Sequence, residues 1–199
     1  MYSFIYLASK SPRRQELLSQ IGVPFKLLEQ QIDECLQEGE QAEKLVTRLA
    51  KDKAVSSQKL LVTQNLENAP VLGSDTIVVS RDNNNKEIIL GKPRNKKDAI
   101  HMLKLLSNGT HKVYTAVCIT DTKQTFTELS SSHVSFAQLN DQDIEAYWNT
   151  GEPEGKAGSY AIQGKAAKFI SNISGSYSSI MGLPLYETNK LLKKFPISF

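Results

Sequence analysis

VLGSDTIVV, residues 71–79, has the composition of a buried β-strand except at its polar centre. Aspartate is depleted in strands, and an isolated buried carboxylate costs on the order of several kcal/mol. We therefore interpret Asp75 as a functional residue, with a carboxylate paired to a structural cation as the alternative. Because side chains alternate along a strand, Gly73 lies on the same face as Asp75, and we expect it to leave room for a ligand there.

The segments around this strand predict an α/β fold. Residues 86–90 would pair with residues 71–79 in a hairpin, joined by the polar turn at residues 82–85. Hydrophobic periodicity predicts further strands at residues 4–8, 24–28, 113–120, 125–136 and 168–173. Helices are predicted at residues 12–20, 42–61, 95–106 and 141–148, and from about residue 185 onward. Because helices and strands alternate without a strict βαβ rhythm, we expect a mixed sheet.

Length and charge limit the kinds of function. A chain of 199 residues suits one large domain or two closely joined lobes that share a core. The hydrophobic fraction of 40% and the charged fraction of 23% are typical of a globular protein. A net charge of +3, from 24 basic and 21 acidic residues, is too balanced for nucleic-acid binding by bulk electrostatics. An anion site would therefore have to be built from a few well-placed cations.

The cysteines and the N-terminus favour a cytoplasmic protein. Cys35 and Cys118 show neither metal-ligand spacing nor a CxxC pattern, so we expect reduced thiols, with a single disulfide as the alternative. Residues 1–7 lack the charged n-region of a signal peptide, and no apolar run is long enough to span a bilayer. We therefore expect a protein that resides in the cytoplasm and does not bind membranes.

Several cations break the local structural pattern. Arg13 and Arg14 occupy the first turn of a predicted helix, where the macrodipole disfavours cations but a bound phosphate would favour them. Lys53 falls in the centre of the apolar stripe of the long predicted helix, and an inward lysine needs an anion unless it snorkels to solvent. Lys92 follows the second strand of the hairpin, which would bring it back toward the first. Solvated surface side chains are the alternative for the arginines and for Lys92.

Together these features predict a site for a polyphosphate and a hard metal ion. The residues with reasons to converge are four cations and two carboxylates: Arg13, Arg14, Lys53, Lys92, Asp75 and Glu34. A triphosphate carries about four negative charges, and Mg²⁺ is commonly bound by one or two carboxylates together with substrate phosphates. Hydrolysis would then need an activated water and cations that hold the phosphate oxygens.

A series of sequence blocks resembles the Maf family of nucleotide pyrophosphatases. The blocks span nearly the whole chain in the family's order: residues 7–18 (LASKSPRRQELL), 32–34 (IDE), 48–54 (RLAKDKA), 73–76 (GSDT), 91–93 (GKP), 156–164 (KAGSYAIQG) and 181–185 (MGLPL). The resemblance implies a single Maf-like domain over residues 1–199. It also implies a two-lobed α/β fold similar to that of inosine triphosphate pyrophosphatases, with an elongated mixed sheet and a central cleft.

The resemblance further implies roles for individual residues. The family's catalytic aspartate corresponds to Asp75, the base that would activate water. Its phosphate- and metal-binding residues correspond to Ser9, Arg13, Arg14, Glu34, Lys53 and Lys92. Asp75 and Glu34 would hold the divalent cation, Mg²⁺ or Mn²⁺. The expected partner is a nucleoside triphosphate, and a homodimer is one arrangement that the sequence itself leaves open.

Three positions relate to substrate choice within the family. One branch acts on dTTP, UTP and related pyrimidine nucleotides, and its arginine, threonine and glutamine match Arg13, Thr76 and Gln163. An amide such as Gln163 can both donate to and accept from a uracil or thymine edge. We therefore expect hydrolysis of dTTP and UTP, and of modified pyrimidine nucleotides, to the monophosphate and pyrophosphate.

The cellular role implied by the resemblance is nucleotide-pool sanitation or cell-division arrest. The alternatives are a 7-methyl-GTP pyrophosphatase and a non-catalytic nucleotide-binding regulator of septation. The chain departs from the family pattern at residues 169–177, which lack the usual acidic residues, and at Ala161, which replaces a common glycine. Both departures bear on substrate preference rather than on the catalytic set.

Overall fold

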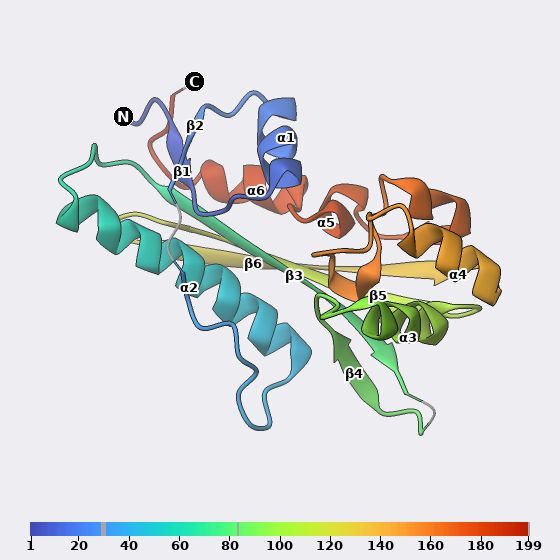
Figure 1. Cartoon of the computed structure of the whole chain (residues 1–199). Helices are drawn as coiled ribbons and strands as arrows, with labels where there is room; N and C mark the ends of the chain where they lie inside the picture. The colour runs from blue at the N-terminus through green and yellow to red at the C-terminus, as the bar shows by residue number, and fades with distance from the viewer. Residues whose placement is uncertain (29–30, 83, 199) are drawn as a thin grey trace. The chain divides into compact units, whose positions relative to one another are not determined.

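A mixed β-sheet organises the computed structural model, which describes residues 1–28, 31–82 and 84–198 (Figure 1). Its seven strands are β1 Ile5–Leu7, β2 Phe25–Leu27, β3 Val71–Arg81, β4 Glu87–Leu90, β5 Thr110–Thr120, β6 Thr125–Phe136 and β7 Ile170–Ser174. The strand order is β2-β1-β3-β5-β6-β7, and β4 pairs with β3. Strand β1 runs parallel to β2 and β3, whereas the β3–β4 and β6–β7 pairs are antiparallel. The predicted α/β class and mixed sheet are confirmed.

The predicted hairpin is the β3–β4 pair. Val78 of β3 faces Leu90 of β4, and Arg81 faces Glu87 at the turn end. Asp82 stabilises the turn because its Oδ1 accepts hydrogen bonds from the backbone N–H of Asn84 and of Lys86, both at 2.9 Å. The predicted turn also includes residue 83, which lies outside the described residues.

Two of the described helices begin at side-chain N-terminal caps. The helices are α1 Pro12–Gln20, α2 Ala42–Thr63, α3 Lys96–Leu106, α4 Asp141–Trp148, α5 Tyr177–Met181 and α6 Leu185–Leu192, with short 3₁₀ helices η1 Ala157–Ser159 and η2 Lys165–Phe169. The Asn95 side chain caps α3, and Asn140 with Asp143 forms a capping box at the start of α4. None of the helices in the described ranges is long and apolar enough to cross a membrane.

Several details of the predicted elements are wrong, and the strand predicted from residue 113 begins at Thr110. The strand predicted from residue 168 begins at Ile170, because residues 165–169 form η2. Ala166 and Phe169 are both buried, and a spacing of three places them on one side of a 3₁₀ turn. Helix α5 was not predicted, since five residues are too few to show a helical period.

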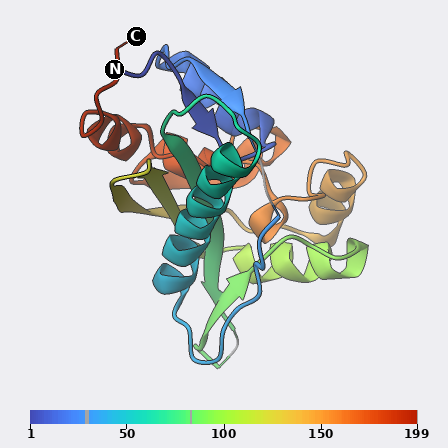
Figure 2. The same ribbon diagram turned by 90° about the vertical axis from the view of Figure 1, so that its left-hand side faces the viewer.

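The chain forms two compact units. Unit 1 comprises Met1–Asp75, Thr115–Ser130 and Gly182–Phe199, and unit 2 comprises Thr76–Tyr114 and Ser131–Met181. In unit 1 the two ends of the chain are joined, because Tyr2 forms a β-bridge with Ile197 (Figure 2). The boundary between the units falls inside β3, between Asp75 and Thr76.

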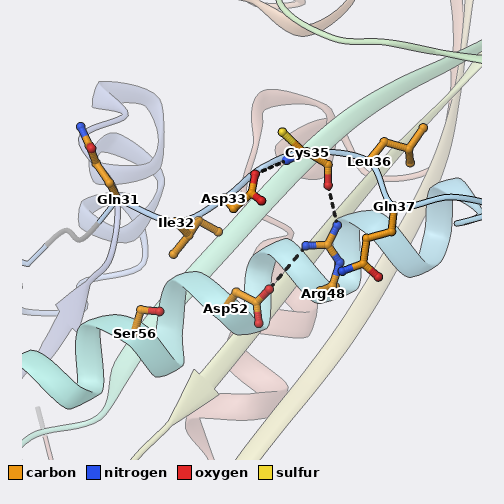
Figure 3. A pocket seen from close by; sticks show the side chains of 9 residues that line it. All are labelled: Gln31, Ile32, Asp33, Cys35, Leu36, Gln37, Arg48, Asp52 and Ser56. Carbon is orange, nitrogen blue, oxygen red and sulfur yellow. Dashed lines mark hydrogen bonds and ion pairs between the residues drawn. The ribbon is translucent and has the colours of Figure 1, made fainter.

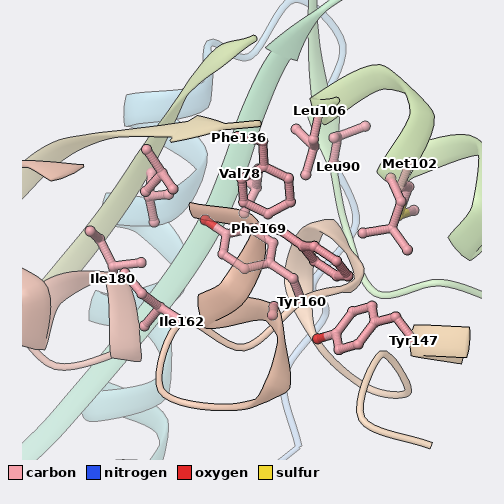
Figure 4. Close-up of a cluster of buried hydrophobic side chains, with 14 of the residues drawn as sticks. Val78, Leu90, Met102, Leu106, Phe136, Tyr147, Tyr160, Ile162, Phe169 and Ile180 are labelled. Carbon is pink, nitrogen blue, oxygen red and sulfur yellow. The ribbon is translucent and has the colours of Figure 1, made fainter. Parts of the chain in front are cut away.

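Each unit has its own hydrophobic core. In unit 1 a cluster joins β1, β3 and α2 through Phe4, Tyr6, Ala8, Leu61, Ala69 and Val71. In unit 2 a larger cluster includes side chains of α3, α4, β6 and η2, and Figure 4 labels Met102, Phe136, Tyr147, Tyr160, Ile162 and Phe169 within it. These cores fix the elements that carry the candidate functional residues.

Candidate active site

Lys53 of α2 joins the two carboxylates that the sequence assigned to a metal ion. Its Nζ lies 2.6 Å from Oδ1 of Asp75 and 2.6 Å from Oε1 of Glu34. The Lys53 side chain is 15% exposed and that of Asp75 is 13% exposed, so their ion pair is largely shielded from water. The inward orientation predicted for Lys53 is confirmed. The cation that pairs with Asp75 is therefore itself one of the predicted phosphate-binding residues.

A close approach between α2 and β3 places Lys53 beside Asp75. A Cβ built on Gly73 would lie 2.4 Å from the carbonyl oxygen of Ala50 and 2.6 Å from the backbone nitrogen of Ala54. Ala50 and Ala54 are fully buried, and their small side chains allow the helix to pack directly on the strand. The expectation that Gly73 leaves room for a ligand is wrong, because the helix backbone fills that space.

Arg14 is fixed by a carbonyl and a hydroxyl group within unit 1. Its Nε donates to the carbonyl oxygen of Gly182 at 2.8 Å, and its Nη1 donates to Oγ of Ser9 at 3.1 Å. Ser9 is buried and also accepts from the backbone N–H of Ser11 at 3.2 Å. Ser9 therefore orients the start of α1 and the Arg14 guanidinium together.

Gly182 is a structural residue that the sequence did not assign to the site. Its carbonyl oxygen accepts from Arg14 and also from Oγ of Ser74 at 3.1 Å. The backbone at Gly182 has φ of 125°, a conformation that L-residues rarely adopt. In the sequence, Gly182 could be noticed only as a member of the block at residues 181–185. The block does not show what the Gly182 carbonyl contacts.

The electrostatic environment of α1 favours an anion. Burial lowers the pKa of Arg14, while the nearby charges of Asp75 and Glu34 act to raise it. Burial also lowers the pKa of Arg13, with Glu16 opposing. Both guanidinium groups remain protonated at neutral pH. The first turn of α1 contains no acidic residue, so two arginines add to the positive helix N-terminus.

Arg48 of α2 holds the segment that carries Glu34. Its Nε donates to Oε1 of Glu40 at 2.7 Å, and its Nη2 donates to Oε2 of Glu40 at 2.8 Å and to the carbonyl oxygen of Cys35 at 3.0 Å. A pocket of about 570 Å³ lies between this segment and α2, and Figure 3 shows the Arg48 guanidinium between Cys35 and Asp52. The backbone next to Glu34 is therefore tied to the same helix that carries Lys53.

Glu34 and Asp75 form a donor pair that suits a hard cation. Within residues 1–28, 31–82 and 84–198, no three His, Cys, Asp or Glu side chains gather closely enough to hold a metal ion. Mg²⁺ usually binds through one or two carboxylates, with substrate phosphates and waters completing its octahedron. Two carboxylates beside the cations predicted to bind phosphate fit that chemistry, if a phosphorylated ligand supplies further oxygen atoms.

The remaining predicted residues belong to unit 2. Thr76 directly follows Asp75 in β3 and is half-buried. Lys92 is exposed and lies two residues beyond Leu90, which pairs with Val78. Gln163 is exposed in the turn before η2. Their convergence with the unit 1 residues on one substrate stays a prediction.

The mixed sheet and the carboxylates beside Lys53 and Arg14 define an α/β protein with a site suited to a phosphorylated anion. Comparison with known sequences makes the assignment specific. The chain belongs to the Maf family, whose sequence model, described as Maf-like protein, matches residues 4–195.

Several relatives match the chain over almost its full length. A protein of Pseudoalteromonas atlantica named dTTP/UTP pyrophosphatase is 50% identical, over 98% of this chain and 98% of its own. A protein of Alkalilimnicola ehrlichii with the same name is 47% identical, over 98% of this chain and 94% of its own. A nucleoside triphosphate pyrophosphatase of Haemophilus ducreyi is 44% identical, over 99% of this chain and 98% of its own.

A solved structure shows only a weak similarity. It is a nucleoside-triphosphatase, dITP/XTP pyrophosphatase, of Mycobacterium abscessus, with 13% identity and a TM-score of 0.38 over 68% of this chain and 73% of that chain. The assignment to the family rests on the sequence relatives.

Proposed function

We propose that this protein is a metal-dependent nucleoside triphosphate pyrophosphatase that hydrolyses dTTP and UTP to the monophosphate and pyrophosphate. The observation that carries the proposal is the contact of Lys53 with both Asp75 and Glu34, in the field of Arg14. The relatives named dTTP/UTP pyrophosphatase support the substrate class. As part of the proposal, the enzyme acts in the cytoplasm, where its nucleotide substrates occur.

Asp75 is the proposed base. A water molecule attacks the α-phosphorus, one of its protons passes to the Asp75 carboxylate, and the bond from the α-phosphorus to the bridging oxygen breaks. Pyrophosphate leaves with the electron pair of that bond. A base positioned in this way contributes about 10²–10⁴-fold to a rate.

The cations stabilise the charge that develops on the phosphate oxygens. The Lys53 ammonium has three N–H donors, and two of them are directed at Asp75 and Glu34, which leaves the third for a phosphate oxygen. Arg13, Arg14 and Lys92 are proposed to hold the departing pyrophosphate through charge-assisted hydrogen bonds. Mg²⁺ or Mn²⁺, held by Asp75 and Glu34, would supply a Lewis acid that polarises the phosphate.

Thr76 and Gln163 are proposed to select the pyrimidine base. The Gln163 amide offers both a donor and an acceptor, which matches the alternating groups on a uracil or thymine edge. A carboxylate at this position would instead favour a cationic base, as in 7-methyl-GTP. The proposal therefore predicts a preference for dTTP and UTP over 7-methyl-GTP.

The test is a panel of nucleoside triphosphates assayed with and without Mg²⁺ or Mn²⁺, with the products separated. We expect metal-dependent release of pyrophosphate and monophosphate, fastest with dTTP or UTP. Release of orthophosphate and diphosphate would contradict the proposed bond cleavage, and fastest turnover of 7-methyl-GTP would contradict the base selection. Nucleotide binding without turnover of any substrate would favour a regulatory binding protein instead.

A further inference from the structure

The turn that carries Gln163 is held at both ends by one pair of side chains, Tyr147 and Glu152. At the first end, the Ala161 backbone N–H donates to the Tyr147 hydroxyl oxygen at 3.3 Å. At the second end, the backbone N–H of Lys165 donates to Oε2 of Glu152 at 2.8 Å, and that of Ala166 donates to Oε1 at 3.2 Å.

The same two side chains are hydrogen-bonded to each other. The Tyr147 hydroxyl donates to Oε1 of Glu152 at 2.7 Å. The turn is closed internally as well, because the Gly164 N–H donates to the carbonyl oxygen of Ala161 at 3.0 Å. Residues 161–166 therefore form a closed loop that is fastened to a single Tyr–Glu pair.

Gly164 leaves the space that the Glu152 carboxylate occupies. A Cβ built on Gly164 would lie 2.3 Å from Oε2 and 2.5 Å from Oε1 of Glu152. The carboxylate thus occupies the space of a side chain, directly beside the residue that follows Gln163. The glycine lets the acid reach the start of η2, where its charge also complements the helix N-terminus.

Burial and hydrogen bonding keep this arrangement rigid and charged. Tyr147 packs edge-on against Phe169 in the core of unit 2, with ring centroids 5.4 Å apart (Figure 4). Burial acts to raise the pKa of Glu152, but hydrogen bonds from Lys165, Tyr147 and Ala166 outweigh it and hold the pKa below its ordinary value. Glu152 is therefore an anion at neutral pH that accepts three hydrogen bonds.

The difference in exposure along the turn indicates which side chain Tyr147 and Glu152 position. Ala161, Ile162 and Ala166 are buried, whereas Gln163 between them is exposed. The pair thus anchors the backbone on both sides of one polar side chain that is directed to solvent. An exposed glutamine has several rotatable bonds, and a fixed backbone removes part of the freedom that it would lose on binding a base.

We infer that Glu152, with Tyr147 as its support, is a positioning residue that fixes Gln163 for reading the pyrimidine base and so sets substrate specificity. This inference rests on the proposed function, in which Gln163 contacts the base. A base contact that is equally strong in the ground state and the transition state changes KM and leaves kcat nearly constant. Loss of the Glu152 carboxylate is therefore expected to change KM for pyrimidine substrates selectively.

The experiment measures steady-state kinetics of Glu152→Gln with UTP and with ATP. The amide turns a donor toward the N–H of Lys165 and breaks that contact with little change in shape. We expect KM for UTP to rise about tenfold, with kcat within about threefold of wild type. ATP kinetics should stay within about twofold, so the preference for UTP over ATP falls about tenfold. Glu154→Gln is the matched control, because Glu154 is exposed two residues away, and it should leave both substrates unchanged.

Gln163→Ala distinguishes the positioning role of Glu152 from the proposed contact of Gln163 with the base. If Gln163→Ala reduces the UTP preference and Glu152→Gln does not, the positioning role is wrong and base reading by Gln163 stands. If Gln163→Ala leaves the preference unchanged, base reading by Gln163 is itself wrong. In the double variant, Glu152→Gln should cause no further loss of preference, and an additive loss would overturn the inference.

Tyr147→Phe provides a second variant that keeps the buried ring. It removes the hydroxyl that joins Ala161 to Glu152, and it should raise KM for UTP without changing ATP kinetics. If Glu152→Gln does not fold, as judged by circular dichroism and thermal unfolding, the kinetics of Tyr147→Phe test the inference instead. An unchanged preference for UTP over ATP in folded Tyr147→Phe would overturn the inference.

Discussion

Gly73 of β3 lies directly against the backbone of Ala50 of α2, so closely that a Cβ on Gly73 would stand 2.4 Å from the Ala50 carbonyl oxygen. This contact sets how near α2 lies to the strand that carries Asp75. Lys53 is three residues beyond Ala50 on the same helix, and its ammonium meets the Asp75 carboxylate at 2.6 Å. Gly73 thus determines the geometry of the charged cluster of Lys53, Asp75 and Glu34 without contributing a functional group.

Gly73→Ala should therefore damage both stability and turnover. The methyl group meets backbone atoms of α2, which cannot move aside as a flexible side chain could, so we expect a loss of about 3 kcal/mol in the free energy of unfolding. Displacement of Lys53 by about 1 Å should reduce kcat for UTP roughly 100-fold. Urea unfolding and steady-state kinetics measure the two effects.

Gly109→Ala is the matched control for this substitution. A Cβ there would make only ordinary contacts, at 3.6 Å from the Leu106 carbonyl oxygen, and its backbone is not in the left-handed region. Stability and kcat should stay near the wild-type values. A Gly73→Ala protein with wild-type stability and turnover would show that the close packing of α2 on β3 does not position the cluster.

Arg48→Met tests how the segment bearing Glu34 is held. The substitution removes two hydrogen bonds to Glu40 and one to the carbonyl oxygen of Cys35, so the backbone next to Glu34 is held less firmly. Loss of a group that orients a metal ligand typically weakens metal affinity by about 10–100-fold. We expect the Mg²⁺ concentration for half-maximal rate to rise at least about tenfold, with a small change in kcat at saturating Mg²⁺.

Arg94→Met is the control for the loss of an arginine. The Arg94 side chain is 85% exposed and pairs with Asp98 at the surface. Its substitution should leave the Mg²⁺ dependence unchanged. Equal Mg²⁺ dependence of Arg48→Met and the wild type would contradict the role of Arg48 in placing Glu34.

His111 should make the stability of the fold depend on pH. Burial lowers its pKa from 6.5 to about 4, and His133 adds to this effect. Its Nε2 is 2.8 Å from the Tyr160 hydroxyl, and its Nδ1 has no hydrogen-bond partner within the described part of the chain. The unfolded chain binds a proton at His111 more tightly than the folded chain does. The contribution of neutral His111 to the stability of the fold is therefore complete above pH 6.5 and is lost as the pH falls toward 4. The loss amounts to about 3 kcal/mol.

Urea unfolding between pH 4.5 and pH 7.5 measures this dependence. In His111→Gln the amide can still contact Tyr160 but does not titrate, so the slope of unfolding free energy against pH should flatten. His133→Gln is the control, because His133 is exposed, and most of the slope should remain. An unchanged slope in His111→Gln would contradict the assignment to His111.

Regular elements with strong local signals could be predicted from the sequence. The bounds of β6 and α4 match the expected ranges 125–136 and 141–148. The inward direction of Lys53 also followed from helical periodicity. These features depend on residues near one another in the chain.

Contacts between distant segments could not be predicted. Sequence shows that Gly73 lacks a side chain, but not whether a ligand or a helix backbone fills the space. Likewise, Glu152 and Gly164 are separated by twelve positions in irregular segments, so no period relates them. Such contacts emerge only when the whole fold brings the backbones together.

Turnover of UTP by Asp75→Asn tests the central claim most directly. Asparagine preserves shape and can still accept a hydrogen bond from Lys53, but it cannot take a proton from water. At saturating UTP and Mg²⁺ we predict at least about a 1,000-fold loss of pyrophosphate release, within the range expected for a general base. Asp141→Asn, at an exposed pair with Lys104, should retain wild-type turnover. Turnover by folded Asp75→Asn within about tenfold of wild type would contradict the account.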